Sequence, residues 1–307
     1  MKNMYLLIVL AAAMLYALII ALMKIAVTGG DAVSTVLVAR YMFAFATLLP
    51  LYLVSNRPTI RTAQLRWHLL RGAIGFGMFV LYTLALERIP LRNAMVLNSS
   101  YVLFVPLLLL IFMRQQPARG AVIGLVVGFV GIIIVSGASV HGYLDVGSCF
   151  ALGSAIAAAS AMVLVARLRL TDSSFTVLFY FFGISLLLSL IWALGSGHVP
   201  PAGSWWVLGA IGALTAVYQQ LLTFALKHLS SVLASSVMTS SVVFGFILDN
   251  LIFHHSSSAR CYIGSGLILI GVLATLWASH TTAVVENEVA AEYLPEKGIM
   301  GQGGAAT

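Results

Sequence analysis

A few polar side chains fall inside long apolar runs of this sequence, and they are the residues that could do chemistry. Such a group is costly at membrane depth unless it faces protein or a water-filled cavity. Arg40 is the clearest case, since it lies about eight residues, or about 12 Å along a helix, from the end of its run. Two interpretations stay open: its guanidinium binds a substrate carboxylate or phosphate, or it is tied to neighbouring carbonyls and fixes helix packing.

Further polar and aromatic residues suit the wall of a cavity. Asn98 and Tyr101 share a helix face at i, i+3 spacing, and Ser241 lies among small hydroxyl residues that let helices approach closely. Lining a cavity and hydrogen bonding between helices are both open for these three residues. Gln219 belongs to an adjacent glutamine pair that cannot face one way, and we expect it to point inward. The residues predicted to contact a substrate are Tyr16, Lys24, Arg40, Phe79, Asn98, Tyr101, Gln219 and Ser241.

The acidic residues are placed elsewhere. Asp31, Asp145 and Asp172 fall in predicted turns, and Asp249 lies near the end of a predicted helix. No carboxylate is therefore expected at mid-membrane, and a proton relay through a buried acid is poorly supported. The sequence contains no P-loop, HExxH or Cys-x-x-Cys motif. We predict no enzymatic activity, no cofactor and no metal site.

Composition indicates the elements that must position these side chains. Of 307 residues, 61% are hydrophobic and only 8% are charged, against roughly 25% charged in a soluble domain. Runs of about 20 apolar residues are long enough to cross the hydrocarbon of a bilayer as helices. We predict an all-α integral membrane protein with ten transmembrane helices: Met4–Ala26, Ala32–Val54, Trp67–Leu86, Arg92–Phe112, Arg119–Gly137, Leu144–Ala166, Ser174–Leu194, Ser204–Leu226, Val232–Phe253 and Ala259–Ser279.

The sequence repeats itself at a spacing of about 140 residues, with Ser100 aligned on Ser240 and two long apolar runs recurring in register. Each copy spans five predicted helices, and an odd number makes the second copy enter the membrane from the opposite side. We therefore predict two inverted five-helix repeats, an architecture typical of secondary transporters. The predicted parts are residues 1–140, residues 141–280 and a disordered cytoplasmic tail, residues 281–307.

Small residues in the fifth and tenth predicted helices indicate how these two helices pack. Gly124, Gly128 and Gly131 occur in the fifth helix, and Gly264 and Gly271 occur in the tenth. A residue without Cβ lets two backbones approach closely, so we expect these two helices to be in contact.

Basic residues indicate the orientation in the membrane. Arg57, Arg61, Arg66 and Arg71 are concentrated in the connection after the second helix, which the positive-inside rule places in the cytoplasm. Both termini are then cytoplasmic. The net charge of +7 is dispersed over short loops, so nucleic acid is not a predicted partner.

Several segments carry a family resemblance. They are Arg40-Tyr41, LYTLALERIPLRNAMVLNSSYVLFVPLLLLIF, GLVVGFVGIIIV, AVYQQLLTFALKHLSSVLASSV and GSGLILIGVLAT. Through them the chain resembles the drug/metabolite transporter superfamily, in particular its EamA-type members, over roughly residues 4–279. The resemblance implies a ten-helix transporter of small metabolites in a bacterial inner membrane. It also implies a central cavity lined by helices 1, 3, 4, 6, 8 and 9, with helices 5 and 10 at the periphery.

Two functions are consistent with these observations. The first is a secondary transporter that moves a small polar metabolite by alternating access: an amino acid, a nucleoside-like compound such as S-adenosylmethionine, or an organic anion. The second is a non-transporting membrane scaffold or partner-binding protein with a transporter fold. A polar cavity between the halves favours the first, and a space plugged by Phe and Leu favours the second. The expected partners are a small-molecule substrate and the lipid bilayer, and a homo-oligomer is compatible with both functions.

Overall fold

All the secondary structure that can be described is helical. The computed structural model describes residues 2–54, 60–113, 119–135, 145–168, 171–196, 204–225, 237–254, 259–260, 262–274 and 277–278. No strand occurs within these ranges. The predicted tail, residues 281–307, lies outside them.

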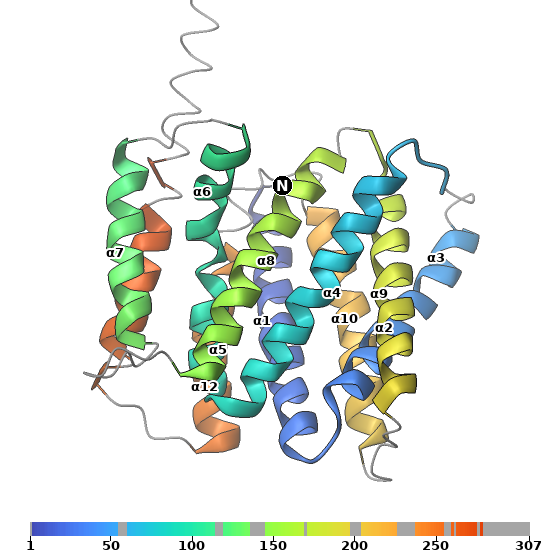
Figure 1. The fold of residues 1–307 in the computed structure, drawn as a ribbon, viewed down its shortest axis with the longest axis horizontal. Helices are drawn as coiled ribbons and strands as arrows, with labels where there is room; N and C mark the ends of the chain where they lie inside the picture. The colour runs from blue at the N-terminus through green and yellow to red at the C-terminus, as the bar shows by residue number, and fades with distance from the viewer. Residues whose placement is uncertain are drawn as a thin grey trace, which may run out of the picture.

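The helices follow the apolar runs of the sequence (Figure 1). Their bounds are α1 Lys2–Thr28, α2 Val33–Ala46, α3 Leu48–Val54, α4 Leu65–Arg88, α5 Leu91–Ser99, α6 Tyr101–Met113, α7 Arg119–Val135, α8 Val146–Leu168, α9 Ser174–Ser196, α10 Trp205–Ala225 and α12 Ser241–Phe253. A further apolar helix spans Tyr262–Ala274.

Five helices are long and apolar enough to cross a membrane by themselves. They contain Met4–Thr28, Leu65–Arg88, Val146–Val165, Ser174–Gly195 and Trp205–Leu222. The other predicted crossings contain shorter apolar helices, because some runs are broken and others reach beyond the described residues. The chain is thus an all-helical membrane protein over its described part, and the count of ten crossings stays a prediction.

Proline and serine account for the breaks inside and between these helices. The second predicted run is divided at Thr47, where Pro50 lacks a backbone N–H and its ring crowds the preceding turn. Ile89, which precedes Pro90, is extended at φ −125° and ψ 158°, so α4 ends and α5 begins at once. The fourth run is divided at Ser100.

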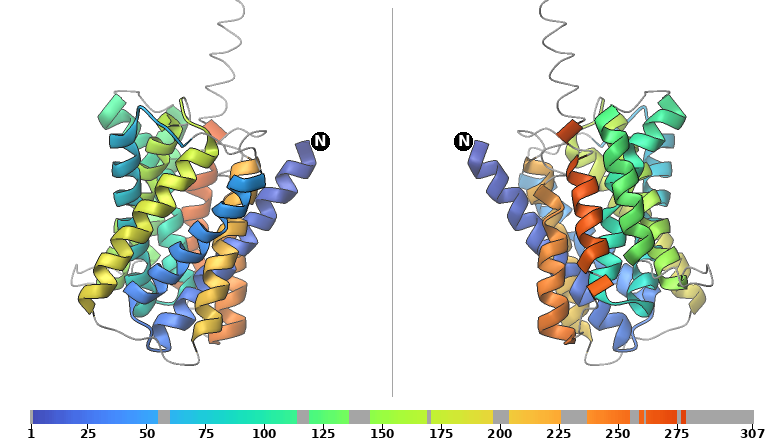
Figure 2. Two further views of the ribbon diagram at one scale, coloured as in Figure 1. Left: turned by 90° about the vertical axis from the view of Figure 1, so that its right-hand side faces the viewer. Right: turned by 90° about the vertical axis from the view of Figure 1, so that its left-hand side faces the viewer.

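Helices from the two halves of the sequence lie against each other rather than in separate bodies. α4 packs along α8, α1 along α10, and α2 along both α9 and α10. Figure 2 shows α1 crossing beside α10 and α12, and both pairs are in contact. The buried core between the halves therefore draws on both, with Tyr41 and Tyr82 from one half and Phe182 from the other among its largest fully buried side chains.

The glycine prediction is confirmed at the edge of the molecule, where α7 lies beside the helix Tyr262–Ala274 (Figure 1). A Cβ added at Gly271 would lie 2.5 Å from the Gly128 nitrogen and 2.6 Å from the Gly124 oxygen. One added at Gly131 would lie 2.7 Å from the Gly264 oxygen. The two backbones are in direct contact, and only glycine leaves room for that approach.

Candidate functional site

A cavity of about 270 Å³ lies between the two halves. Its wall is formed by α1, α4, α8, α9 and α10, together with the residues around Ser100 and Ser240. It reaches Ser174, the first residue of α9, and Arg71 near the start of α4. The neutral polar residues in its wall are Tyr16, Asn98, Ser99, Tyr101, Ser174, Tyr218, Gln219, Thr239 and Ser241.

Two equivalent helix breaks contribute part of this wall. The Ser100 hydroxyl donates to the Leu97 carbonyl at 2.5 Å, and the Ser240 hydroxyl donates to the Val237 carbonyl at 2.6 Å. Hydroxyl groups that bond back to the preceding turn compete with the helix and bend it. The sequence repeat aligns these two serines, so the same serine-to-carbonyl hydrogen bond at a helix break occurs in both halves. Residues next to them line the cavity: Asn98, Ser99 and Tyr101 in one half, Met238, Thr239 and Ser241 in the other.

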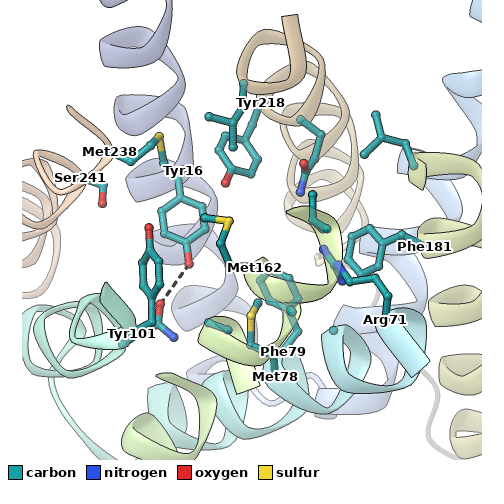
Figure 3. Close-up of a pocket in the computed structure, with 18 of the residues that line it drawn as sticks. Tyr16, Arg71, Met78, Phe79, Tyr101, Met162, Phe181, Tyr218, Met238 and Ser241 are labelled. Carbon is teal, nitrogen blue, oxygen red and sulfur yellow. Dashed lines mark hydrogen bonds between the residues drawn. The ribbon is translucent and has the colours of Figure 1, made fainter. Parts of the chain in front are cut away.

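A hydrogen-bond chain crosses one side of the cavity (Figure 3). The Tyr16 hydroxyl donates to the Asn98 side-chain oxygen at 3.4 Å, and the Asn98 amide donates to the Ser154 hydroxyl at 2.9 Å. The Tyr16 and Tyr218 rings lie 5.3 Å apart between centroids. Asn98 therefore both lines the cavity and joins helices, which are the two interpretations left open above.

Six of the eight predicted site residues line the cavity. They are Tyr16, Phe79, Asn98, Tyr101, Gln219 and Ser241. Arg40 and Lys24 are outside its wall.

Arg40 is 1% exposed and packs behind the aromatic part of the wall. Its Cζ lies 3.9 Å from the centroid of the Phe79 ring, and Nη1 lies 3.2 Å from the Met23 sulfur. Nε and Nη2 have no hydrogen-bond partner among the described residues. A guanidinium over an aromatic face is stabilised by the ring quadrupole, so the contacts of Arg40 are those of a packing residue.

The Lys24 side chain binds backbone carbonyls at the C-terminal end of α4. Its ammonium donates to the Leu86 carbonyl at 2.9 Å and to the Ile89 carbonyl at 2.8 Å. Leu86 lies in the last turn of α4, where Pro90 has no N–H to donate to its carbonyl, and Ile89 is the extended residue that follows the helix. Lys24 therefore ties α1 to the end of α4.

Arg71 is the charged wall residue that sequence reasoning missed. It was grouped with a basic connection, but its position on α4 turns it into the cavity. Its Cζ lies 4.2 Å from the centroid of the Phe181 ring (Figure 3). The available signal was spacing, since Arg71, Gly75 and Phe79 recur at i, i+4 and i+8 and so share one helix face.

The two ends of the helical body are joined differently. At the end opposite Arg71, the buried Arg92 Nη1 donates to Asp249 Oδ2 at 2.6 Å, and the Leu91 N–H donates to Oδ1 at 3.1 Å. Asp249 is fully buried. This ion pair links α5 in the first half to α12 in the second.

The end near Arg71 is joined through Asp172, in the turn between α8 and α9. Its Oδ2 lies 2.7 Å from His68 Nε2 and accepts a 2.7 Å bond from the Thr62 hydroxyl. Desolvation acts to raise the pKa of the Asp172 carboxyl, but the hydrogen bonds from His68 and Thr62 outweigh it and hold that pKa below its ordinary value. The His68 ring also packs against Tyr180, with centroids 4.6 Å apart and the ring planes tilted by 32°.

Comparisons with known proteins agree with this geometry. The pseudopaline exporter CntI of Pseudomonas aeruginosa is 27% identical over 253 residues, covering 80% of this chain and 88% of the exporter. A riboflavin transporter of Vibrio cholerae is 24% identical, covering 83% and 86%. An S-adenosylmethionine uptake transporter of Rickettsia felis is 26% identical, covering 64% and 66%.

The fold has a counterpart of known structure. A crystal structure of another protein superposes with a TM-score of 0.66 at 18% identity, covering 90% of this chain and 97% of that one. At this identity the likeness concerns the fold alone.

The sequence profile of one family matches the chain twice, over residues 3–137 and 145–277. These matches cover most of the chain, and each falls on one of the two halves that form the cavity. The predicted resemblance is therefore confirmed. The chain is an integral membrane protein that belongs to the EamA-like transporter family.

Proposed function

We propose that this protein is a secondary transporter that moves a small polar metabolite across the membrane by alternating access through the cavity between its halves. The observation that carries the proposal is the cavity itself. Its wall combines residues from both halves, and tyrosine, asparagine, glutamine and serine side chains face it at membrane depth. A scaffold would gain nothing from these polar groups, which are costly there unless they serve a site or a packing contact.

The size of the cavity limits the cargo. Ligand pockets commonly measure about 300–1,000 Å³, and the value of about 270 Å³ lies just below this range. A substrate the size of an amino acid, a small organic anion or a compact nucleoside-like compound is in keeping with this volume. The related proteins named for pseudopaline, riboflavin and S-adenosylmethionine support a metabolite rather than an ion or a macromolecule.

The architecture that we propose for this function has ten crossings in two inverted five-helix repeats, residues 1–140 and 141–280. Both termini lie in the cytoplasm of a bacterial inner membrane. The paired helix breaks at Ser100 and Ser240 support this arrangement, because transporters of this type place broken helices at the substrate site. The Arg71 end of the cavity then faces the cytoplasm.

Uptake into proteoliposomes tests the proposal. Purified protein is reconstituted and challenged with radiolabelled amino acids, organic acids, nucleosides, riboflavin and S-adenosylmethionine. We expect at least one compound to accumulate above protein-free liposomes in a saturable manner. Accumulation of none of them by folded protein would favour the scaffold function.

A matched pair of variants assigns the transport to the cavity. Ala158 lines the cavity, so Ala158→Trp should fill it and abolish uptake. Ile156 lies on the same helix, is 45% exposed and is not part of the wall, so Ile156→Trp should leave uptake within about twofold of the wild type. Equal uptake by the two variants would place the path elsewhere.

A further inference from the structure

The cavity contains one charged side chain among the described residues of its wall, and that residue is Arg71. Its Nε and Nη1 are buried and have no hydrogen-bond partner in the described part of the chain. Figure 3 shows the side chain leaving α4 beside Phe181 and directed toward the space that Tyr16 and Tyr218 also face. Two buried guanidinium donors without partners are an electrostatic cost that an anionic ligand would offset.

The local sequence makes room for this guanidinium. Gly75 lies one turn after Arg71, and a Cβ there would collide with Arg71 Nη1 and lie 2.6 Å from Phe181 Cε2. The guanidinium is thus held between the Gly75 backbone and the Phe181 ring. This position fixes the plane of the fork, which leaves less conformational entropy to lose when a planar carboxylate binds.

The other arginine of this region is arranged differently. Arg40 packs on Phe79 and is not in the cavity wall, whereas Arg71 packs on Phe181 and is. The two rings belong to one aromatic cluster, because the Tyr41 ring lies 6.3 Å from Phe79 and 6.0 Å from Phe181. Arg71, rather than Arg40, is therefore the arginine placed to bind a charged ligand.

The rest of the wall restricts the ligand further. No aspartate or glutamate is among the described wall residues, so the single positive charge is balanced by one negative charge on the ligand rather than by the protein. Between Arg71 and the polar group at Tyr16 and Asn98, the wall carries Met78, Phe79 and Met162, which suit an apolar or aromatic body.

We infer that Arg71 binds the carboxylate of the substrate, and that the cargo class is a monocarboxylate with an apolar or aromatic body and a neutral polar group at its far end. This inference rests on the proposed function and specifies its substrate class. A phosphate dianion would exceed the single balancing charge, and the ammonium group of a zwitterion would find no acid in the described wall.

Binding of matched acids and amides tests the inference. The probes are phenylacetate with phenylacetamide, and indole-3-acetate with its amide, titrated into purified full-length protein in detergent by calorimetry and thermal shift. We expect each acid to bind at least tenfold more tightly than its amide, from a charge-assisted hydrogen bond. Equal affinity within a pair, or no stabilisation by any acid at millimolar concentration, would overturn the inference.

Variants assign the preference to Arg71. Arg71→Met should lower acid affinity about ten- to a hundredfold and leave amide affinity unchanged. The matched control is Arg66→Gln, an exposed arginine of the same helix, which should keep the acid preference. An acid preference that survives in Arg71→Met contradicts the assignment.

The folding of Arg71→Met must also be measured. Replacing an uncompensated buried charge by an apolar side chain of similar length is neutral or stabilising, so Arg71→Met should fold as well as the wild type. If it does not, Arg71→Lys is measured instead, and it should retain a preference for acids at several-fold lower affinity. A folded Arg71→Lys protein with no preference between acid and amide would equally overturn the inference.

The outcomes separate this inference from the proposed function. Because binding in detergent does not depend on translocation, a protein that binds acids through Arg71 but accumulates nothing in proteoliposomes contradicts only the proposed function. A protein that transports amides or zwitterions and ignores acids contradicts only the inference.

Discussion

The two ends of this molecule join the same two halves of the chain with different chemistry. At one end Arg92 and Asp249 form a 2.6 Å ion pair with side chains that are 7% and 0% exposed. At the other end Asp172, in the turn between α8 and α9, meets Thr62 and His68, and the His68 and Asp172 side chains are 1% and 9% exposed. Both contacts are largely buried, but the first pairs two formal charges, whereas the second is a hydrogen-bonded cluster in which the histidine is charged only if protonated.

The difference shows which end is held together more strongly. Breaking a buried ion pair leaves an uncompensated charge, which costs several kcal/mol, whereas an ordinary hydrogen bond contributes about 0.5–1.5 kcal/mol. The cavity also lies toward the His68 end, since its wall includes Arg71 and Ser174 but neither Arg92 nor Asp249. The Arg92 end, which lies away from the cavity, is therefore the more strongly joined of the two.

The largest expected effect comes from neutralising the buried acid. Asp249→Asn removes the charge that Arg92 and the Leu91 N–H contact, and should destabilise the folded protein by about 3–5 kcal/mol. Thermal unfolding in detergent measures this loss of stability. The control is Asp145→Asn at the start of α8, where asparagine caps a helix as well as aspartate and the change should be small. Equal losses of stability in Asp249→Asn and Asp145→Asn would contradict the stronger joining of the Arg92 end.

Lys24 provides a second test of the Arg92 end. Lys24→Met deletes two hydrogen bonds from an ammonium to the last carbonyls of α4 and should cost about 1.5–3 kcal/mol. Arg88 is the matched cation, because it is 44% exposed beside Glu87, and Arg88→Met should cost below about 1 kcal/mol. A cost for Lys24→Met no greater than that for Arg88→Met would show that this end is not tied together through α1.

The smallest effect is expected at the His68 end, and it depends on pH. Because the folded-state pKa of Asp172 is depressed below 3.8, its contribution is present above that value and is lost as the pH falls through the folded-state pKa. The difference in thermal stability between the wild type and Asp172→Asn should therefore be about 1 kcal/mol at about pH 5 and should shrink toward about pH 3. A difference that grows on acidification would contradict the depressed pKa.

Much of the fold followed from apolar periodicity, because a membrane helix needs an unbroken apolar run and little else. The predicted runs coincide with helices over most of the described chain. The repeat aligned Ser100 on Ser240, but the helix breaks at these two positions were not predicted. The glycines of α7 were predicted correctly, since small residues have one main use between membrane helices.

The site was harder to predict, because the direction of a side chain depends on tertiary packing. Arg40 and Lys24 looked functional for being charged within apolar runs, yet one packs on a ring and the other caps a helix. Arg71 looked like a surface residue because four arginines are clustered there in sequence. Arg71 already fell within the predicted helix Trp67–Leu86, and its place in the wall follows from the direction in which α4 turns it and from the space at Gly75.

If the cavity carries the transported metabolite, blocking it must stop uptake. A thiol reagent can block it in a background without Cys149 and Cys261, with Met162→Cys in the wall and Ala63→Cys at an exposed position outside it. We predict that a charged, membrane-impermeant reagent modifies both cysteines, stops uptake only in Met162→Cys, and reacts more slowly there when substrate is bound. Full uptake by modified Met162→Cys protein would contradict the claim.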